Sequence, residues 1–181
     1  EISIDEKILF LGEWCKQYSR KNIWSHLDYK VLPYHWNYFQ QMKSDYQLIK
    51  NVYEKYLENL VKKLNGLHNV NYSTEYWRVI IGPWLQIFIG VVLDKWLSIK
   101  EALRMEKISN TWLLDFGKDE FVPLGMKEMY FMFDSNLWHH YIFSQVIIAN
   151  QKIPYEKVKL NSTPETLKLS TFDLSFFLKK L

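Results

Sequence analysis

The chain has 181 residues, which is enough for one substantial hydrophobic core or two small ones. Apolar residues make up 48% of it, a share that argues against an intrinsically disordered chain. The net charge of +3 comes from 23 basic and 20 acidic residues spread along the sequence, so no dense basic block indicates a nucleic-acid partner.

The first predicted element is a short buried strand at Ile8–Leu11. Gly12 allows a tight turn after it and places Glu13 just beyond the carboxyl end of the strand. Ligands bind at this end of open α/β sheets because loops and helix amino termini converge there. Glu13 is therefore a candidate functional carboxylate, with turn capping as the equally weighted alternative. A second, very short strand is expected at Val31-Leu32.

A long amphipathic helix is expected next. Ser44 and Gln47 have the form of a capping box at its start, and Gly66 is expected just past its end. One face carries apolar residues at spacings of three and four, which predicts that this stripe lies in the core. Its members are Met42, Tyr46, Ile49, Tyr53, Tyr56, Leu60 and Leu64.

The middle of the chain predicts a second helix that starts at Ser73 or Thr74 as N-cap. Gly82-Pro83 is expected to break or kink it, because proline removes a backbone donor and clashes with the preceding turn. The piece that follows, from about Trp84 to Met105, is apolar on nearly every side until Asp94. Such a helix is expected between layers of the fold.

The last third contains a predicted buried strand at Thr111–Phe116 and a helix from about Gly125 to Phe133. Asp134-Ser135 is expected to cap a further helix. Lys157–Leu160 is a possible last strand, before a linker and the apolar stretch Phe172–Leu181. Short strands that alternate with long helices favour a single α/β domain over residues 1–181, rich in helix and with a small, mostly parallel sheet.

Several features bear on the cellular compartment. Cys15 is the only cysteine, which excludes an intramolecular disulfide and fits a reducing compartment. We see no signal peptide, and the apolar run Val79–Leu93 is interrupted and shorter than the roughly 20 residues of a membrane crossing. These features predict a cytoplasmic protein with at most peripheral membrane contact. The chain begins at Glu1 without a methionine, as a piece of a longer protein would.

The usual strong catalytic signatures are missing. The sequence has no phosphate loop, GxGxxG, GxSxG, HExxH or CxxC motif. Only His139 and His140 are adjacent among the five histidines, and successive helix residues point in different directions. We therefore predict no metal site and no cofactor.

Three aromatic and polar clusters remain as candidate sites: Glu13-Trp14, Tyr34-His35-Trp36, and Tyr76-Trp77-Arg78 with Gly82-Pro83-Trp84. Glu13 and His35 each follow a predicted strand, so they are the candidate general acid or base. The planar fork of Arg78 suits a phosphate or carboxylate, although an ion pair with a nearby glutamate explains it equally well. The predicted substrate-binding residues are Trp14, Tyr34, Trp36, Trp77, Arg78, Trp84 and His139.

The ordered motifs also resemble a family of bacterial transferases that is associated with genes for surface polysaccharide or lipopolysaccharide assembly. The resemblance covers nearly the whole chain, and family members are longer, so this sequence would be their amino-terminal portion. Asn37-Tyr38 stands where the family often has acidic residues. The stretches that carry the resemblance are Leu9–Lys16, Ser19–Lys21, Leu32–Trp36, Tyr76–Leu85, Asp134–His139 and Tyr141–Ile148.

The resemblance implies a Rossmann-like half of a two-domain, GT-B-like glycosyltransferase. Such an enzyme moves a sugar from a nucleotide-activated donor to a growing glycan. Glu13 or His35 would deprotonate the acceptor hydroxyl, and Arg78 would stabilise phosphate charge on the leaving group. The amino-terminal half usually holds the acceptor, so this piece would need the remainder of a longer chain for activity.

Two other classes of function stay open. A non-catalytic glycan- or partner-binding module would use the aromatic side chains to stack on sugars or to dock another helix. Transfer of another group, such as sulfate or phosphate, shares the logic of anion binding. The absence of a phosphate loop counts against that third class.

Overall fold

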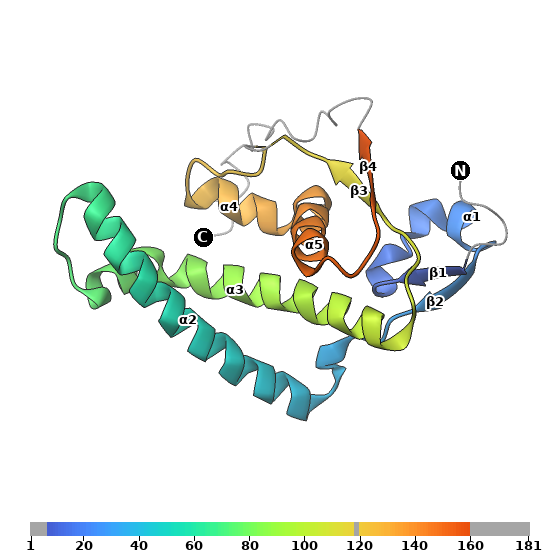
Figure 1. Ribbon diagram of the computed structural model, residues 1–181, viewed down its shortest axis with the longest axis horizontal. Helices are drawn as coiled ribbons and strands as arrows, with labels where there is room; N and C mark the ends of the chain where they lie inside the picture. The colour runs from blue at the N-terminus through green and yellow to red at the C-terminus, as the bar shows by residue number, and fades with distance from the viewer. Residues whose placement is uncertain (1–6, 118–119, 160–181) are drawn as a thin grey trace, which may run out of the picture.

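The computed structural model describes residues 7–117 and 120–159, and most of them are helical (Figure 1). Three single turns of 3-10 helix, Glu13–Cys15, Tyr18–Arg20 and His35–Asn37, punctuate the first part of the chain. The helices and strands, in chain order, are β1 (Lys7–Phe10), α1 (Lys21–Trp24), β2 (Asp28–Val31), α2 (Phe39–His68), α3 (Thr74–Met105), β3 (Trp112–Asp115), α4 (Met126–Phe133), α5 (Asn136–Asn150) and β4 (Glu156–Lys159).

The four strands form within a few residues of the predicted positions and pair in parallel. They make two separate two-stranded sheets in the described chain, β1 with β2 and β3 with β4. Lys7 lies opposite Asp28 in the first sheet, and Trp112 lies opposite Glu156 in the second. The parallel pairing agrees with the sequence, whereas a Rossmann-like half of a GT-B fold stays a prediction.

Helix α2 is present as predicted, but both of its ends differ from the prediction. It begins at Phe39, so Ser44 lies inside the helix and does not cap it. Its last residue is His68, and Asn69 takes the left-handed conformation with a φ of 52°. The Asn69 N–H then reaches the open carbonyls of the last turn. Gly66 is therefore an interior residue, because asparagine supplies the left-handed position.

Helix α3 is a single helix, which corrects the prediction of a break at Pro83. Ser73 is the N-cap, as expected, and its hydroxyl accepts a hydrogen bond from the Tyr76 N–H. Pro83 lies inside the helix, where its missing N–H interrupts one backbone bond without ending the element. The unbroken helix is long and apolar enough to cross a membrane by length and composition alone, unlike the shorter run Val79–Leu93.

The apolar stripe of α2 is only partly in the core. Ile49, Tyr53, Leu60 and Leu64 pack against buried residues, as predicted. Met42, Tyr46 and Tyr56 are exposed, so the prediction is wrong for these three side chains. Helix α3 covers a narrower face of α2 than the stripe spans. The residues that α2 buries most completely are Leu57, Val61 and the unexpected Asp45.

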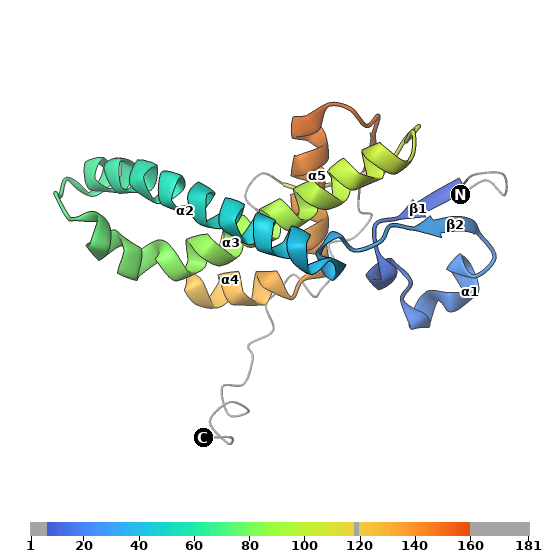
Figure 2. The same cartoon turned by 90° about the horizontal axis from the view of Figure 1, so that it is seen from below.

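Three hydrophobic clusters lie along α3 from its amino to its carboxyl end, and α2 and α5 pack against it (Figures 1 and 2). The first joins α3 to α2 around Leu57 and Trp77. The second joins it to α4 and α5 around Trp138, and the third joins its last turns to β3 and α5 around Ile99. Helix α3 is therefore the shared element of the core.

Helices α4 and α5 and strand β4 agree with their predictions, whereas no helix was predicted at the position of α1. Helix α4 ends at Phe133, and Ser135 caps α5 by accepting a hydrogen bond from the Trp138 N–H. Strand β4 covers most of the predicted strand Lys157–Leu160. The predicted apolar stretch Phe172–Leu181 lies outside the described residues.

Candidate functional site

Two adjacent charged residues lie in the interior of the molecule, in the carboxyl half of α3. Asp94 and Lys95 have side chains that are 13% and 12% exposed. The Lys95 ammonium donates to Asp94 Oδ2 at 2.6 Å, so the two charges neutralise each other. A buried pair of this kind is costly to desolvate and contributes little to stability by itself. Its presence in a long, apolar helix marks this position as a candidate site.

The loop after β2 brings His35 to this pair. Pro33 and the extended Tyr34 end the strand, and the 3-10 turn that follows closes with a hydrogen bond from the Asn37 N–H to the Tyr34 carbonyl. The His35 side chain is 9% exposed, and its Nε2 lies 3.3 Å from Asp94 Oδ1. Asp94 thus contacts an imidazole with one oxygen and an ammonium with the other.

Aromatic rings form a wall around this histidine. The Tyr34 ring lies 4.8 Å from the His35 ring and 6.0 Å, edge-on, from the ring of Trp14. The Trp36 ring lies 4.9 Å from His35 and 5.9 Å from Tyr34, and its indole N–H donates to the buried carboxylate of Asp45 at 3.0 Å. Trp14 is 48% exposed, so the wall extends from the interior to the surface.

His139, on α5, lies near the Asp94–Lys95 pair. Its Nε2 donates to the Phe133 carbonyl at 2.7 Å, which leaves Nδ1 as the acceptor of the neutral ring. Phe143, one turn further on the same helix, has its ring 5.1 Å from the Lys95 ammonium. Among the described residues, the buried side-chain atoms without a hydrogen-bond partner are His35 Nε2, Asp94 Oδ1 and His139 Nδ1.

Burial sets the protonation states in this cluster. It lowers the pKa of His35 from its ordinary value, and the neighbouring Asp94 carboxylate opposes the shift only in part. It lowers the pKa of His139 as well, helped by the Lys95 charge. Burial and the Asp94 carboxylate together raise the pKa of Tyr34 to about 12. Both imidazoles are therefore neutral near pH 7, and the phenol keeps its proton.

Glu13, the other predicted acid or base, has a different environment. Its side chain is 74% exposed and forms an ion pair with Lys16 at 2.7 Å. The turn that holds it also carries Trp14, so Glu13 lies next in sequence to the aromatic wall. The high exposure of Glu13 favours a structural role at the turn over a catalytic one. The buried contact with Asp94 makes His35 the better candidate for the base.

The third predicted cluster lies elsewhere on α3. Arg78 makes a bidentate ion pair with Glu54 at 2.8 and 2.7 Å. This confirms the alternative prediction, an ion pair with a nearby glutamate. Trp77 is buried and donates to Asn65, and Trp84 stacks on the Phe88 ring. Arg78 and Asp94 are sixteen residues apart, or about 24 Å along a helix. One phosphate-sized group cannot bridge that span.

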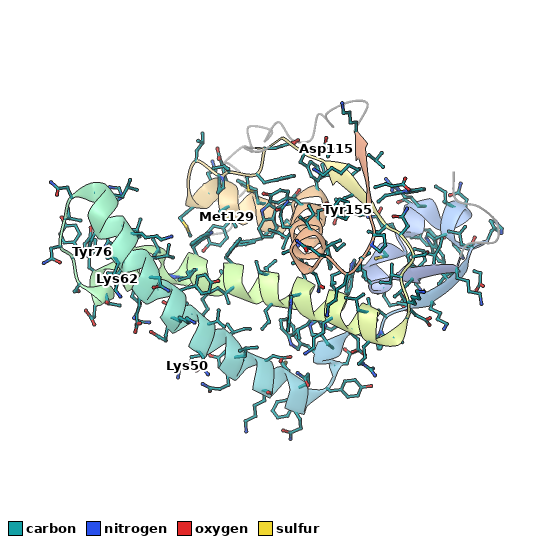
Figure 3. The ribbon with its side chains drawn as sticks, viewed as in Figure 1. Lys50, Lys62, Tyr76, Asp115, Met129 and Tyr155 are labelled. Carbon is teal, nitrogen blue, oxygen red and sulfur yellow. The ribbon has the colours of Figure 1, made fainter. Side chains whose placement is uncertain are left out.

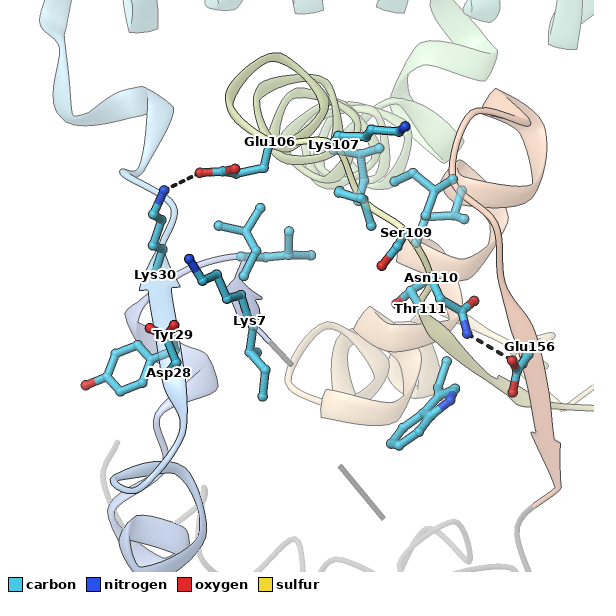
Figure 4. A pocket seen from close by; sticks show the side chains of 18 residues that line it. Lys7, Asp28, Tyr29, Lys30, Glu106, Lys107, Ser109, Asn110, Thr111 and Glu156 are labelled. Atoms are coloured by element: carbon cyan, nitrogen blue, oxygen red, sulfur yellow. Dashed lines mark hydrogen bonds and ion pairs between the residues drawn. The ribbon is translucent and has the colours of Figure 1, made fainter. Parts of the chain in front are cut away.

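A cavity of about 840 Å³ opens between the two sheets (Figure 4). The starts of the strands and the segment after α3 line it, and it contains none of the predicted site residues. Lys30 and Glu106 form an ion pair across one side, and Asn110 donates to Glu156 on the other (Figure 4). Ligands of open α/β sheets bind at the opposite, carboxyl ends, where His35 lies.

Sequence reasoning missed Asp94, Lys95 and Asp45. The first two are the only charged residues between Arg78 and Lys100, and that isolation in an apolar helix is a signal that could have identified them. Asp45 gave no such signal, because it lies among polar residues and is buried only through Trp36 and Gln41. No group of three or more metal-ligating side chains occurs within the described ranges.

The described chain is rich in helix, and it holds a buried histidine–carboxylate–lysine cluster beside aromatic rings, of which Trp14 is exposed. The chain belongs to the LIC12162 family of transferases, whose family model matches residues 2–177. No curated protein matches the chain. No solved structure matches it either.

Proposed function

We propose that this chain is the amino-terminal part of a glycosyltransferase that moves a sugar from a nucleotide-activated donor to a bacterial surface glycan. The family supports transfer chemistry, and one observation supports the site: neutral His35, held 3.3 Å from the buried Asp94 carboxylate. A neutral imidazole oriented by a carboxylate is a common general base. Cytoplasmic location stays a prediction.

In the proposed reaction, His35 carries its proton on Nε2, 3.3 Å from Asp94 Oδ1, and accepts the acceptor hydroxyl proton at Nδ1. The hydroxyl oxygen attacks the anomeric carbon of the donor, and the bond from that carbon to the phosphate oxygen breaks. The nucleotide leaves with the electron pair. Asp94 stabilises the imidazolium that forms, and Lys95 holds Asp94 in place through its 2.6 Å bond.

The aromatic wall supports a sugar as the acceptor. Trp14 exposes nearly half of its surface beside Tyr34, whose ring meets it edge-on. Aromatic faces pack on the apolar C–H faces of sugars, while the hydroxyl groups find polar partners at the rim. Arg78 has no part in this version of the site, because Glu54 already neutralises it.

The test measures nucleotide release by the full-length protein that carries this sequence, with CMP-, UDP-, GDP- and ADP-sugars and short bacterial glycans. We expect His35→Asn to reduce release at least about 100-fold, the scale of a general base. His26→Asn, at an exposed histidine, is the matched control and should keep full activity. Full activity of the His35 variant would refute the assignment.

A non-catalytic glycan-binding module is the second candidate, and the low exposure of His35 favours it, since only 9% of the side chain reaches solvent. In that case, glycans quench tryptophan fluorescence in a saturable way, Trp14→Ala weakens the binding, and no donor releases nucleotide. Release of nucleotide with any donor excludes this candidate.

A further inference from the structure

The amino-terminal half of α3 carries an apolar face that the described protein leaves open. Tyr76, Val79, Ile80, Pro83 and Ile87 recur at helical spacings, which places them on one side of the helix. All five are exposed; Val79 reaches 77% and Ile80 53%. Three of the five, Val79, Ile80 and Ile87, are branched aliphatic residues, and none of the five is charged. We call these five residues the open face.

The open face belongs to a part of the molecule that projects from the rest. Helices α2 and α3 form a long hairpin that extends away from the sheets, with its tip at the far end (Figures 1 and 2). Leu67, near the tip, is 78% exposed. Beyond Ile87 the helix is better covered, because Val91 packs into the cluster with α4 and α5, although Trp96 is still 40% exposed. The two most exposed apolar residues of α3, Val79 and Ile80, lie on the projecting half.

Helix α3 has the composition of a helix in contact with lipid. Its most apolar 18-residue window has a mean hydropathy of 1.5, and only 22% of that window is buried inside the molecule. Core helices of this hydropathy are mostly covered by protein. The exposed apolar side chains of α3 therefore form a patch of the kind that marks an interaction site.

The tip carries the side chains that suit lipid headgroups. Tyr72 and Tyr76 stack at 4.2 Å, and both are partly exposed, as aromatic residues at a membrane interface are. Lys62 and Lys63 are exposed in the last turns of α2 and form no ion pair with a described residue. Figure 3 shows Lys62 and Tyr76 at the same end of the hairpin. Glu75 lies there too, so the positive excess is small.

We propose that the open face of α3 binds the surface of a lipid bilayer, with the helix lying in the plane of the interface. A spanning orientation is disfavoured, because Asp94 and Lys95 are engaged with His35 inside the fold. In-plane binding leaves that cluster intact and places apolar side chains below the headgroups. Because the charge excess is small, affinity should depend mainly on apolar burial and only modestly on salt.

The experiment measures co-sedimentation of the protein with vesicles made from equal parts of phosphatidylethanolamine and phosphatidylglycerol. We expect the wild type to bind, and the double variant Val79→Asp/Ile80→Asp to bind at least about tenfold more weakly. Ile23→Asp is the matched control, since Ile23 is 58% exposed on α1, at the other end of the molecule, and it should leave binding unchanged.

Three outcomes would overturn the proposal: no vesicle binding by the wild type, equal loss in the control variant, or a wild-type dimer in light scattering that the double variant splits. The last result would assign the open face to self-association. Circular dichroism checks that the variants keep their helices. Val79→Ser/Ile80→Ser provides a milder second test, with the same direction of change expected.

Discussion

The Asp94 carboxylate is hydrogen-bonded to Lys95 and lies beside the His35 ring and the Tyr34 phenol. Lys95 takes Oδ2, and His35 approaches Oδ1 from the loop after β2. The residue therefore joins an otherwise apolar helix to the segment that carries the proposed base. Removing its charge leaves the Lys95 ammonium in a site that is only 12% exposed. That site is costly for an unpaired cation.

We expect Asp94→Asn to lower the free energy of unfolding by about 3 kcal/mol, the usual effect of removing one partner of a buried pair. The double variant Asp94→Leu/Lys95→Met should lose less, because it removes the buried cation together with its partner. Urea unfolding of both variants measures the difference. A double variant less stable than Asp94→Asn would show that the pair itself stabilises the fold.

The buried histidines predict how stability changes with pH. Burial lowers the pKa of His35, His139 and His140 in the folded state, so the unfolded chain binds more protons as the pH falls. Their stabilising contribution is complete above the unfolded pKa of about 6.5 and is lost as the pH falls toward the folded values. Unfolding in urea at pH 7.5, 6.5 and 5.5 should show decreasing stability.

His140 identifies one source of that loss. Its Nε2 accepts a hydrogen bond from the Leu114 N–H at 3.0 Å, which links α5 to β3. Protonation converts the acceptor into a donor and breaks the link. His140→Gln should therefore lose less stability between pH 7.5 and 5.5 than the wild type does. Equal losses would place the pH dependence on the other histidines.

The sequence predicts those side chains whose role depends on their near neighbours along the chain. His35 and His139 are candidates because each lies beside aromatic residues at the start of a helical turn or helix. The role of Arg78 depends on Glu54, twenty-four positions away on another helix, and no local pattern shows that contact. The burial of Asp45 likewise depends on the position of Trp36.

At the scale of single elements, the end of α2 can be tested with a substitution at Gly66. The two possible helix ends predict opposite changes in the free energy of unfolding. If the helix ended at Gly66, alanine there would be strained and destabilising. In the structure Gly66 is interior, and an added Cβ meets no atom within 4 Å. We expect Gly66→Ala to raise the free energy of unfolding by about 0.5–1 kcal/mol.

Asn69→Ala is the companion variant, because Asn69 holds the left-handed conformation with φ at 52°. It should lower stability by about 1 kcal/mol, since alanine is disfavoured in that region. Thermal or urea unfolding of the two variants measures both changes in stability. A loss of stability in Gly66→Ala would show that the helix ends at Gly66 and not at His68.

The elements themselves were predictable because their signals are local. Ser73 and Ser135 have the residue type and position that caps require, and both cap as expected. The break predicted as one outcome at Pro83 does not occur, because packing on both sides of the proline, from Trp77 to Ile89, outweighs its tendency to end a helix. Which side chains of α2 are exposed depends on the width of its contact with α3, and periodicity alone does not give that width.

On the scale of the whole molecule, α3 connects three clusters that the sequence does not place in space. Strand positions were predictable, but the division into two sheets was not, because it depends on which strands meet in space. The polar site likewise forms only when the loop after β2 and helix α5 meet on α3. Such contacts join residues far apart in sequence.

A helix shared by every cluster should make unfolding cooperative from end to end. Leu57 is fully buried between α2 and α3, and Ile147 is buried between α5 and β3 in a different cluster. We expect Leu57→Ala and Ile147→Ala each to lower stability by about 2–5 kcal/mol and to shift one common transition. Because the clusters are separate, the two effects should add in the double variant to within about 0.5 kcal/mol.

The measurement follows urea unfolding by far-ultraviolet circular dichroism, which reports all helices, and by near-ultraviolet dichroism, which reports the packing of rings such as buried Trp138. Coincident curves in both variants confirm that α3 couples the hairpin to the rest of the fold. If Leu57→Ala instead produces an early helical transition while the near-ultraviolet signal persists, the hairpin unfolds separately. In that case α3 frays from its projecting half, and only its carboxyl half, with Asp94 and Lys95, belongs to the cooperative core.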